Sequence, residues 1–145
     1  MKPDRLMATD PMTDPVADTN NDPIRYSAVS RASRIKLKKA EKILEVDFED
    51  GKQFAFAAEL LRVESPSAEV QGHSADQKIT VAGRRHVNIM NVVAVGNYAV
   101  QLTFDDLHDT GIYSWSYLYE LGCNMESRWA SYLGALQNEG LSRDP

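Results

Sequence analysis

Three aspartates and one histidine lie within five residues of each other in the segment Asp105-Asp106-Leu107-His108-Asp109. Carboxylates and imidazoles are ligands for iron, zinc and manganese, and they also act as general bases. An iron site of two histidines and one carboxylate needs a second, distant histidine, and none follows His108. Aspartate and glycine are also typical turn formers. The local chemistry therefore favours a structural turn, with a weak metal site as the alternative.

The polar segment at residues 64–77 is the second place where side chains could do chemistry. It contains Ser65 and Glu69 and includes His73 near its end. Ser65 and His73 could form a nucleophile–base pair, but no strand–turn–helix elbow surrounds Ser65. His73, His86 and His108 could also converge on a metal, although scattered surface histidines are the more common arrangement. A structured loop is the first interpretation, a binding surface the second and a catalytic serine the third.

Composition excludes several classes of function. The 145 residues carry a formal net charge of −5, which disfavours nucleic acid and anionic membrane as general partners. The single cysteine, Cys123, excludes an intrachain disulfide and a cysteine-rich zinc site. No apolar run approaches the roughly 20 residues that span a bilayer, and the N-terminus lacks an apolar signal region. A cytoplasmic location is therefore expected.

The chain divides by composition into a tail and a domain. Residues 1–33 contain four prolines and five aspartates but few large apolar side chains. Such a segment cannot bury enough surface to offset its ordering entropy, so it is predicted to be disordered. An ordered domain is predicted over residues 34–138, followed by a flexible C-terminus at residues 139–145.

Hydrophobic periodicity predicts an α+β domain. Apolar residues at period two predict strands, and Asp50-Gly51 between two such runs is a strong hairpin signal. Helical spacing predicts C-terminal helices, with Ser114 capping the first, Gly122 ending it and Asn124 capping the second. The expected fold is an antiparallel β-sheet built from hairpins, with C-terminal helices packed near it. The predicted elements are strands at 34–39, 43–48, 52–56 and 97–104, a helical turn at 57–63, and a hairpin over 78–89 turning near Ala82-Gly83.

Two longer stretches resemble a known family. "LRVESPSAEVQGH" (61–73), "VGNYAVQLTFDDLHDTGIYSWSYLYELG" (95–122) and the strands between them are similar to the gamma-butyrobetaine hydroxylase-like N-terminal domain family. The resemblance covers roughly Ile35 to Gly122. In the full-length hydroxylases this domain precedes an iron and 2-oxoglutarate dioxygenase domain, which this chain is too short to contain. The resemblance therefore implies no hydroxylase activity here, and the protein is not expected to be an enzyme.

The resemblance also bears on metal binding. The hydroxylases hold a structural zinc with three clustered cysteines, which follow a Leu-Arg pair, and with a histidine in the turn after a strand. Here Leu61-Arg62 is followed by Val63-Glu64-Ser65-Pro66-Ser67, and His108 matches the histidine. One zinc ligand of about four remains. The cofactor is therefore undetermined, with zinc or iron as candidates. The candidate metal ligands are His108, His73, Asp105 and Asp109.

These observations predict a small non-enzymatic binding or interaction domain. Similar domains are fused to P-loop ATPases of the iron–sulfur carrier type, so the resemblance implies a link to an iron-dependent oxygenase or to iron–sulfur assembly. Binding of iron or zinc is the alternative function, and a standalone enzyme is the least favoured. The partner is expected to be another protein, not nucleic acid or membrane. The predicted binding surface comprises Arg62, Ser65, Glu69, His73, Asp105, His108 and Trp115.

Overall fold

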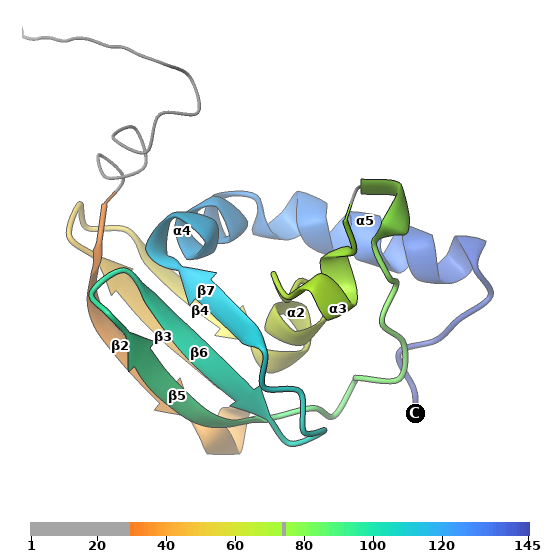
Figure 1. Cartoon of the computed structure of the whole chain (residues 1–145), viewed down its shortest axis with the longest axis horizontal. Helices are drawn as coiled ribbons and strands as arrows, with labels where there is room; N and C mark the ends of the chain where they lie inside the picture. The colour runs from red at the N-terminus through yellow and green to blue at the C-terminus, as the bar shows by residue number, and fades with distance from the viewer. Residues whose placement is uncertain (1–29, 74) are drawn as a thin grey trace, which may run out of the picture.

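In the part of the chain that the structure describes, two three-stranded antiparallel sheets and a group of helices make up the fold (Figure 1). The computed structural model describes residues 30–145 except residue 74. Most of the predicted disordered tail, residues 1–33, lies outside the described residues. The predicted α+β class, with antiparallel strands followed by C-terminal helices, is confirmed.

The first sheet has the order β2-β3-β4. It contains β2 (Ala32–Lys38), β3 (Ile43–Phe48) and β4 (Gln53–Ala57), close to the three predicted strands. Gly51 has a φ of +97° in the β3–β4 turn, a conformation that glycine adopts without steric cost. The predicted Asp-Gly hairpin is therefore confirmed. The buried face of this sheet consists of Leu44, Val46, Phe48 and Phe56.

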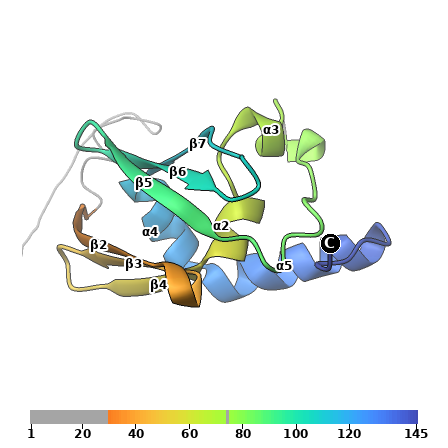
Figure 2. The same ribbon diagram turned by 90° about the horizontal axis from the view of Figure 1, so that it is seen from below.

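The second sheet has the order β5-β6-β7. It contains β5 (Ile89–Val95), β6 (Ala99–Phe104) and β7 (Gly111–Ser114). The sequence predicts one continuous sheet, whereas Figure 2 shows two sheets in separate layers, with side chains of both in one core. Strand β7 was missed because it has only four residues and begins with the glycine of a turn-like segment. Val100, Leu102 and Phe104 alternate into the core, within the strand predicted at 97–104.

The predicted hairpin over residues 78–89 is wrong. Most of this segment is irregular, and only its last residue belongs to β5. Ile79 N donates to Val70 O at 2.7 Å, and Gly83 N donates to Ser142 O at 2.9 Å. Its backbone groups thus bond to a helix and to the C-terminal segment instead of to a paired strand. Residue alternation alone does not reveal which partner an extended backbone will find.

The helices cover one side of the two sheets (Figure 1). Every residue of α2 is buried, so this short helix is part of the core. None of the helices in the described part of the chain is long and apolar enough to cross a membrane. The helical elements are η1 (Lys39–Glu41), α2 (Ala58–Val63), α3 (Ala68–Gln71), η2 (Ala75–Gln77), α4 (Trp115–Cys123) and α5 (Met125–Asn138).

The helix ends match the sequence only in part. Ser114 caps α4, because its Oγ accepts from Tyr117 N at 3.1 Å. Asn124 is the N-cap residue of α5 as predicted, but its side chain makes no capping hydrogen bond, since its Nδ2 donates back to Glu120 O at 2.8 Å. Gly122 does not end α4, which continues to Cys123. A Cβ at Gly122 would lie 2.6 Å from the Phe54 ring, so the glycine is explained by close packing and not by a helix stop.

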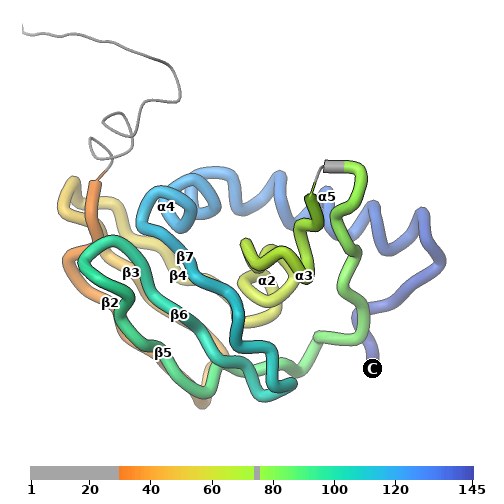
Figure 3. Tube along the Cα trace, in the orientation of Figure 1, coloured from red at the N-terminus to blue at the C-terminus, as the bar shows by residue number. Residues whose placement is uncertain are grey.

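The last residues run beside the irregular segment near Gly83 (Figure 3). Arg143 Nη2 and Nε donate to the two carboxylate oxygens of Glu59 at 2.7 and 2.8 Å. The same guanidinium lies 5.1 Å from the centroid of the Trp129 ring. These contacts join Arg143, which lies in the predicted flexible C-terminus at residues 139–145, to α2 and α5.

Candidate functional site

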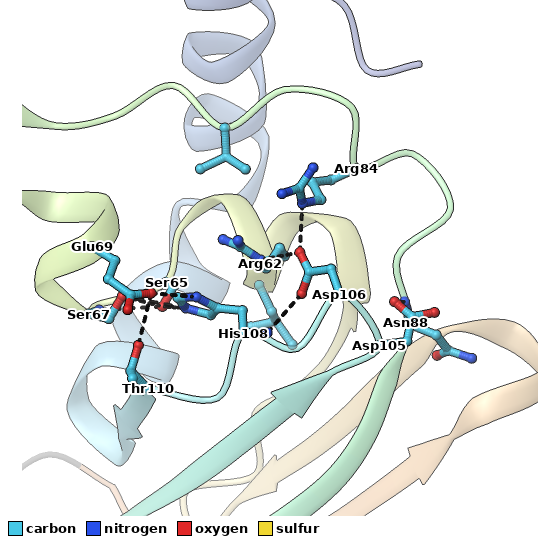
Figure 4. Close-up of polar contacts among 12 residues, drawn as sticks. Arg62, Ser65, Ser67, Glu69, Arg84, Asn88, Asp105, Asp106, His108 and Thr110 are labelled. Carbon is cyan, nitrogen blue, oxygen red and sulfur yellow. Dashed lines mark hydrogen bonds and ion pairs between the residues drawn. The ribbon is translucent and has the colours of Figure 1, made fainter. Parts of the chain in front are cut away.

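The β6–β7 turn and the loop between α2 and α3 meet around one imidazole (Figure 4). Ser65 Oγ lies 2.9 Å from His108 Nε2, and Ser67 Oγ lies 3.4 Å from the same nitrogen. On the other side of the ring, Glu69 Oε1 lies 3.0 Å from His108 Nδ1. Thr110 Oγ1 donates to the same Glu69 oxygen at 3.3 Å. We call these five residues the His108 cluster.

Asp106 joins the turn to two arginines. Its Oδ2 accepts from Arg62 Nε at 2.8 Å and from Arg84 Nε at 2.6 Å, and its Oδ1 accepts from the backbone N–H of His108 at 3.1 Å. Burial alone would raise the pKa of Asp106, but the hydrogen bonds from Arg62 and the His108 N–H, with the Arg62 charge, hold that pKa below its usual value. Asp106 is therefore an ionised centre of this network at neutral pH.

His108 is neutral at pH 7. Burial lowers the pKa of its imidazole, the charge of Arg62 lowers it further, and the opposing effects of Glu69 and Asp106 do not restore it. The carboxylate beside Nδ1 assigns the ring proton to that nitrogen, so Nε2 accepts from the Ser65 hydroxyl. The neutral ring thus links the loop and the turn through two hydrogen bonds.

Leu107, at the tip of the turn, has an unusual backbone conformation. Its φ is +73°, in the left-handed region that costs a non-glycine residue about 1 kcal/mol. Leu107 N donates to Phe104 O at 3.0 Å, and Phe104 N donates to His108 O at 2.9 Å, which closes the turn. The leucine is 86% exposed. The turn therefore presents an apolar side chain to solvent directly beside the His108 cluster.

The order Ser65–His108–Glu69 is that of a nucleophile, a base and an orienting carboxylate. However, Ser65 has no exposed surface, and a Cβ at Gly111 would lie 2.8 Å from its Oγ. A substrate carbonyl has no room beside this hydroxyl. The arrangement is therefore a buried structural link, and its histidine is not the one that the nucleophile hypothesis paired with Ser65.

A structural zinc does not fit these residues. Ser65 and Ser67 bring hydroxyls to His108 Nε2, and zinc sites in proteins use thiolate, imidazole or carboxylate ligands. Both imidazole nitrogens already lie against protein partners. Among the described residues, no group of three or more His, Cys, Asp or Glu side chains could hold a metal. Hydrogen bonds hold this loop and this turn together.

The structure brings together part of the predicted surface. His73 is exposed, and its backbone N donates to Gln77 Oε1 at 2.9 Å. Asp105 Oδ1 accepts from the backbone N of Asn88 at 3.1 Å, and Asp109 is exposed. These three candidate metal ligands do not join His108 in one cluster. Elsewhere, the Trp115 indole donates to the Asn97 carbonyl. The predicted residues that meet through the turn are Arg62, Ser65, Glu69 and His108.

Sequence reasoning did not single out Asp106 or Arg84. Asp106 is one of three aspartates in five residues, and nothing local distinguishes the one that receives two arginines. Arg84 lies in the segment wrongly assigned to a hairpin. The one available signal is Arg62, a charged residue inside the otherwise largely apolar helix α2, which requires a buried counter-ion.

A cavity of about 300 Å³ opens beside Asp106 and His108. Both arginines that bind Asp106 line it, and its other lining residues are partly polar and partly apolar. Nη1 of Arg62 is buried and has no hydrogen-bond partner among the described residues. The lining residues are Arg62, Glu69, Val70, Ile79, Thr80, Val81, Ala82, Arg84 and His108.

Acidification is expected to destabilise the fold through His108. Because its pKa is lowered in the folded chain, the unfolded chain binds more protons below about pH 6.5. The free energy of unfolding should therefore fall as pH drops below that value, by at most about 1.4 kcal/mol per pH unit for one proton. Urea unfolding at several pH values measures this slope.

The same measurement on two variants identifies the histidine responsible. His108→Asn should flatten the slope between about pH 5 and pH 7, whatever its stability at neutral pH. His73→Asn is the matched control, since His73 is exposed. An unchanged slope in the His108 variant would assign the pH dependence to another group.

The fold and the His108 cluster define a small α+β domain of two layered antiparallel sheets. The family described as "Gamma-butyrobetaine hydroxylase-like, N-terminal" matches residues 35–119, and the chain belongs to this family. The predicted resemblance is thereby confirmed. No curated protein matches the chain.

Solved structures of similar proteins share this fold. Two proteins with solution NMR structures are 46% and 43% identical to this chain, each with a TM-score of 0.71. The matches cover 82% and 81% of this chain and 89% and 93% of those chains. A crystal structure of a DUF971-family protein of unknown function from Acidithiobacillus ferrooxidans is 39% identical, with a TM-score of 0.53, and the match covers 63% of this chain and 92% of that one.

Proposed function

We propose that the protein is a small non-enzymatic interaction domain, which binds another protein through the surface around the β6–β7 turn. The observation that carries this proposal is Leu107, which combines a φ of +73° with 86% exposure. A strained backbone that displays a large apolar side chain is the kind of outlier from which a functional role is inferred. Leu107 then acts as the apolar anchor of the interface.

The surroundings of Leu107 have the composition of a binding surface. Asp106, which precedes Leu107 in the turn, pairs with Arg84, and the cavity that Arg84 lines includes apolar residues. Ile79, which lines that cavity, is 53% exposed. An apolar anchor beside a pocket and within a polar rim is the usual composition of protein–protein hot spots.

The nature of the partner is proposed from the family. An iron-dependent oxygenase or an iron–sulfur assembly protein in the cytoplasm is the partner we infer. The burial of Ser65 supports the non-enzymatic assignment. Binding of zinc or iron through His108 is the weaker alternative, because both ring nitrogens would first have to leave their present partners.

The test replaces Leu107 by glycine. Glycine relieves the left-handed strain, so the free energy of unfolding should stay unchanged or rise by up to about 1 kcal/mol. Capture of an oxygenase or iron–sulfur protein by the tagged chain from its native cells should nevertheless fall at least about tenfold, as expected for loss of a hot spot. Quantitative mass spectrometry of the captured proteins measures the second effect.

Leu133→Ala is the matched control, because Leu133 is 40% exposed on α5. It should leave capture of the same protein unchanged. Equal capture by the Leu107 variant and the unaltered chain would refute this placement of the interface. For the metal alternative, saturable NMR shifts at His108 on titration with zinc or anaerobic ferrous iron would be the contrary result.

A further inference from the structure

Arg62, which lines the cavity, carries a buried donor without an acceptor. The Nε of Arg62 bonds to Asp106, but its Nη1 is buried and unpaired within the described part of the chain. The Arg62 side chain is only 9% exposed. Leaving a buried donor unpaired is costly, and the cost is larger when the donor is charged. A ligand oxygen that accepts a hydrogen bond from Nη1 would remove this unfavourable contribution to the free energy.

The charge at this end of the cavity favours a single negative charge. Arg62 and Arg84 both line the cavity, and both bond to the same oxygen of Asp106. Two guanidinium groups and one carboxylate leave one net positive charge. Glu69 also lines the cavity, but its side chain is 66% exposed and its carboxylate lies against His108. A monoanion therefore matches the inner charge better than a phosphate dianion does.

The remaining walls favour an apolar group attached to that charge. Val70 and Val81 line the cavity, and at 2% and 9% exposed they are largely packed into the core. Ile79 and Ala82 extend the same wall. Thr80 is the polar residue within this segment, and its hydroxyl donates to Glu139 at 2.5 Å. Pockets of this kind orient a ligand by a few polar groups and hold it by apolar contact.

We propose that this cavity binds the carboxylate of a monoanionic ligand that carries a short apolar chain. The unpaired end of Arg62 and the guanidinium of Arg84 receive the carboxylate, and the valine-lined wall receives the chain. Figure 4 shows the free end of the Arg62 side chain directed away from Asp106, toward the side on which His108 lies. This inference rests on the proposed binding function, because it names a group that the binding surface recognises.

Entry of the ligand requires a small adjustment. Nη1 is covered in the ligand-free chain, so the carboxylate must displace the side chains above it. Residues 78–82 form neither helix nor strand. Ile79 N donates to Val70 O at 2.7 Å, and Val81 O accepts from the Tyr132 hydroxyl at 2.6 Å. This segment can shift without breaking a sheet or a helix. Its amide signals should therefore report binding.

The experiment is an amide proton–nitrogen NMR titration of the full chain with butyrate at constant ionic strength. Saturable shifts should cluster at residues 79–84 and at the Arg62 Nε–H, with a Kd of about 1 mM, as expected for a ligand of six heavy atoms. Butyramide has the same shape without the charge, and it should bind about tenfold more weakly or worse. No saturable butyrate shift at these residues, or equal binding of butyramide, would overturn the proposal.

Two neighbouring arginines supply matched variants. Arg84→Gln removes a cavity guanidinium, whereas Arg85→Gln removes one that pairs with Asp144 outside the cavity lining. The first should weaken butyrate binding about tenfold, and the second should leave it unchanged. Both arginines are partly exposed, so both variants should fold. The test therefore remains decisive even if a variant of the buried Arg62 fails to fold. Equal affinity of the two variants for butyrate would refute the assignment.

Two sources can present this carboxylate, and a peptide titration distinguishes them. A short peptide ending in valine is compared with its C-terminal amide. Tighter binding of the free acid than of butyrate would identify the C-terminus of a partner protein, and tighter binding of butyrate would identify a small carboxylic acid. If carboxylates fail to bind but Leu107→Gly still loses capture of the partner protein, the proposed interaction function is supported and this ligand is refuted. If carboxylates bind but Leu107→Gly captures the partner as well as the unaltered chain does, the ligand site is supported and the proposed interface is refuted.

Discussion

Replacement of Asp106 by alanine is expected to lower the free energy of unfolding by about 3–5 kcal/mol, the usual cost of removing one partner from a buried ion pair. The Arg62 side chain, 9% exposed, would lose the carboxylate that accepts from its Nε. Arg84 and the backbone N–H of His108 would lose the same acceptor group. Since small domains have roughly 5–15 kcal/mol of stability, this change should bring the chain close to unfolding at room temperature. Urea denaturation followed by circular dichroism measures it.

Asp109→Ala is the control for Asp106→Ala. Asp109 belongs to the same turn but is exposed, so its replacement should change the free energy of unfolding by less than about 0.5 kcal/mol.

A double variant separates the effect of the unpaired charge from the effect of the lost side-chain shape. Adding Arg62→Met to Asp106→Ala removes the unpaired cation and should restore part of the stability. A loss below about 1 kcal/mol in the single variant would show that Arg62 finds another acceptor.

The strand pattern of the first sheet could be predicted because its causes are local. Alternation in β3 and the Asp50-Gly51 turn act over a few residues, and each has one common structural outcome. The segment at residues 78–88 has a similar alternation but pairs with no strand among the described residues, because its backbone bonds to α3 and to the C-terminal residues. Those partners lie far away in sequence, and no local pattern indicates them. The separation of the strands into two sheets also depends on contacts between residues far apart in the sequence, so no local pattern predicts it.

The sequence predicted which segments form the candidate site, but not which side chains pair with each other there. The loop after α2 and the β6–β7 turn were both identified from their polar residues, and the resemblance placed the segment after Leu61-Arg62 and His108 at the positions of zinc ligands in related proteins. The partners that decide the chemistry are Asp106, which receives Arg62 from α2, and Arg84, which comes from an irregular segment. Their meeting depends on how the second sheet packs over α2. The spacing of residues along the sequence does not reveal ion pairs between residues that are far apart in the chain.

The hydroxyls of the His108 cluster also explain why the loop holds its position without thiolates. Ser65 Oγ reaches the imidazole, and Gln71 Nε2 donates to the Ser65 carbonyl at 2.8 Å. The buried hydroxyl of Tyr113, on β7, donates to the carbonyl of Leu61 in α2, the helix that precedes this loop. Burial raises the pKa of Tyr113 far above its usual value, so this donor keeps its proton at any physiological pH. Several neutral hydrogen bonds thus hold this corner together, in keeping with the neutral state of His108.

Gly122→Ala is expected to destabilise the fold by about 1–3 kcal/mol, the typical cost of overpacking, although alanine is the better helix former. The new Cβ would lie 2.6 to 2.7 Å from three atoms of the Phe54 ring. That ring cannot easily move, because it packs edge-on against Phe48 and Tyr119 at centroid distances of 5.8 and 6.0 Å. Thermal unfolding followed by circular dichroism would show a lower midpoint.

The same substitution in the neighbouring helix should have the opposite effect. Gly134 lies inside α5, and a Cβ there would meet no atom within 4 Å. Gly134→Ala should therefore raise the free energy of unfolding by about 0.5–1 kcal/mol, the helix-propensity gain alone. Opposite signs for two identical changes would attribute the role of Gly122 to its approach to Phe54. Stabilisation by both changes would mean that the aromatic side chains of β3, β4 and α4 repack with little cost, and that this corner of the core is less rigid than its edge-on contacts indicate.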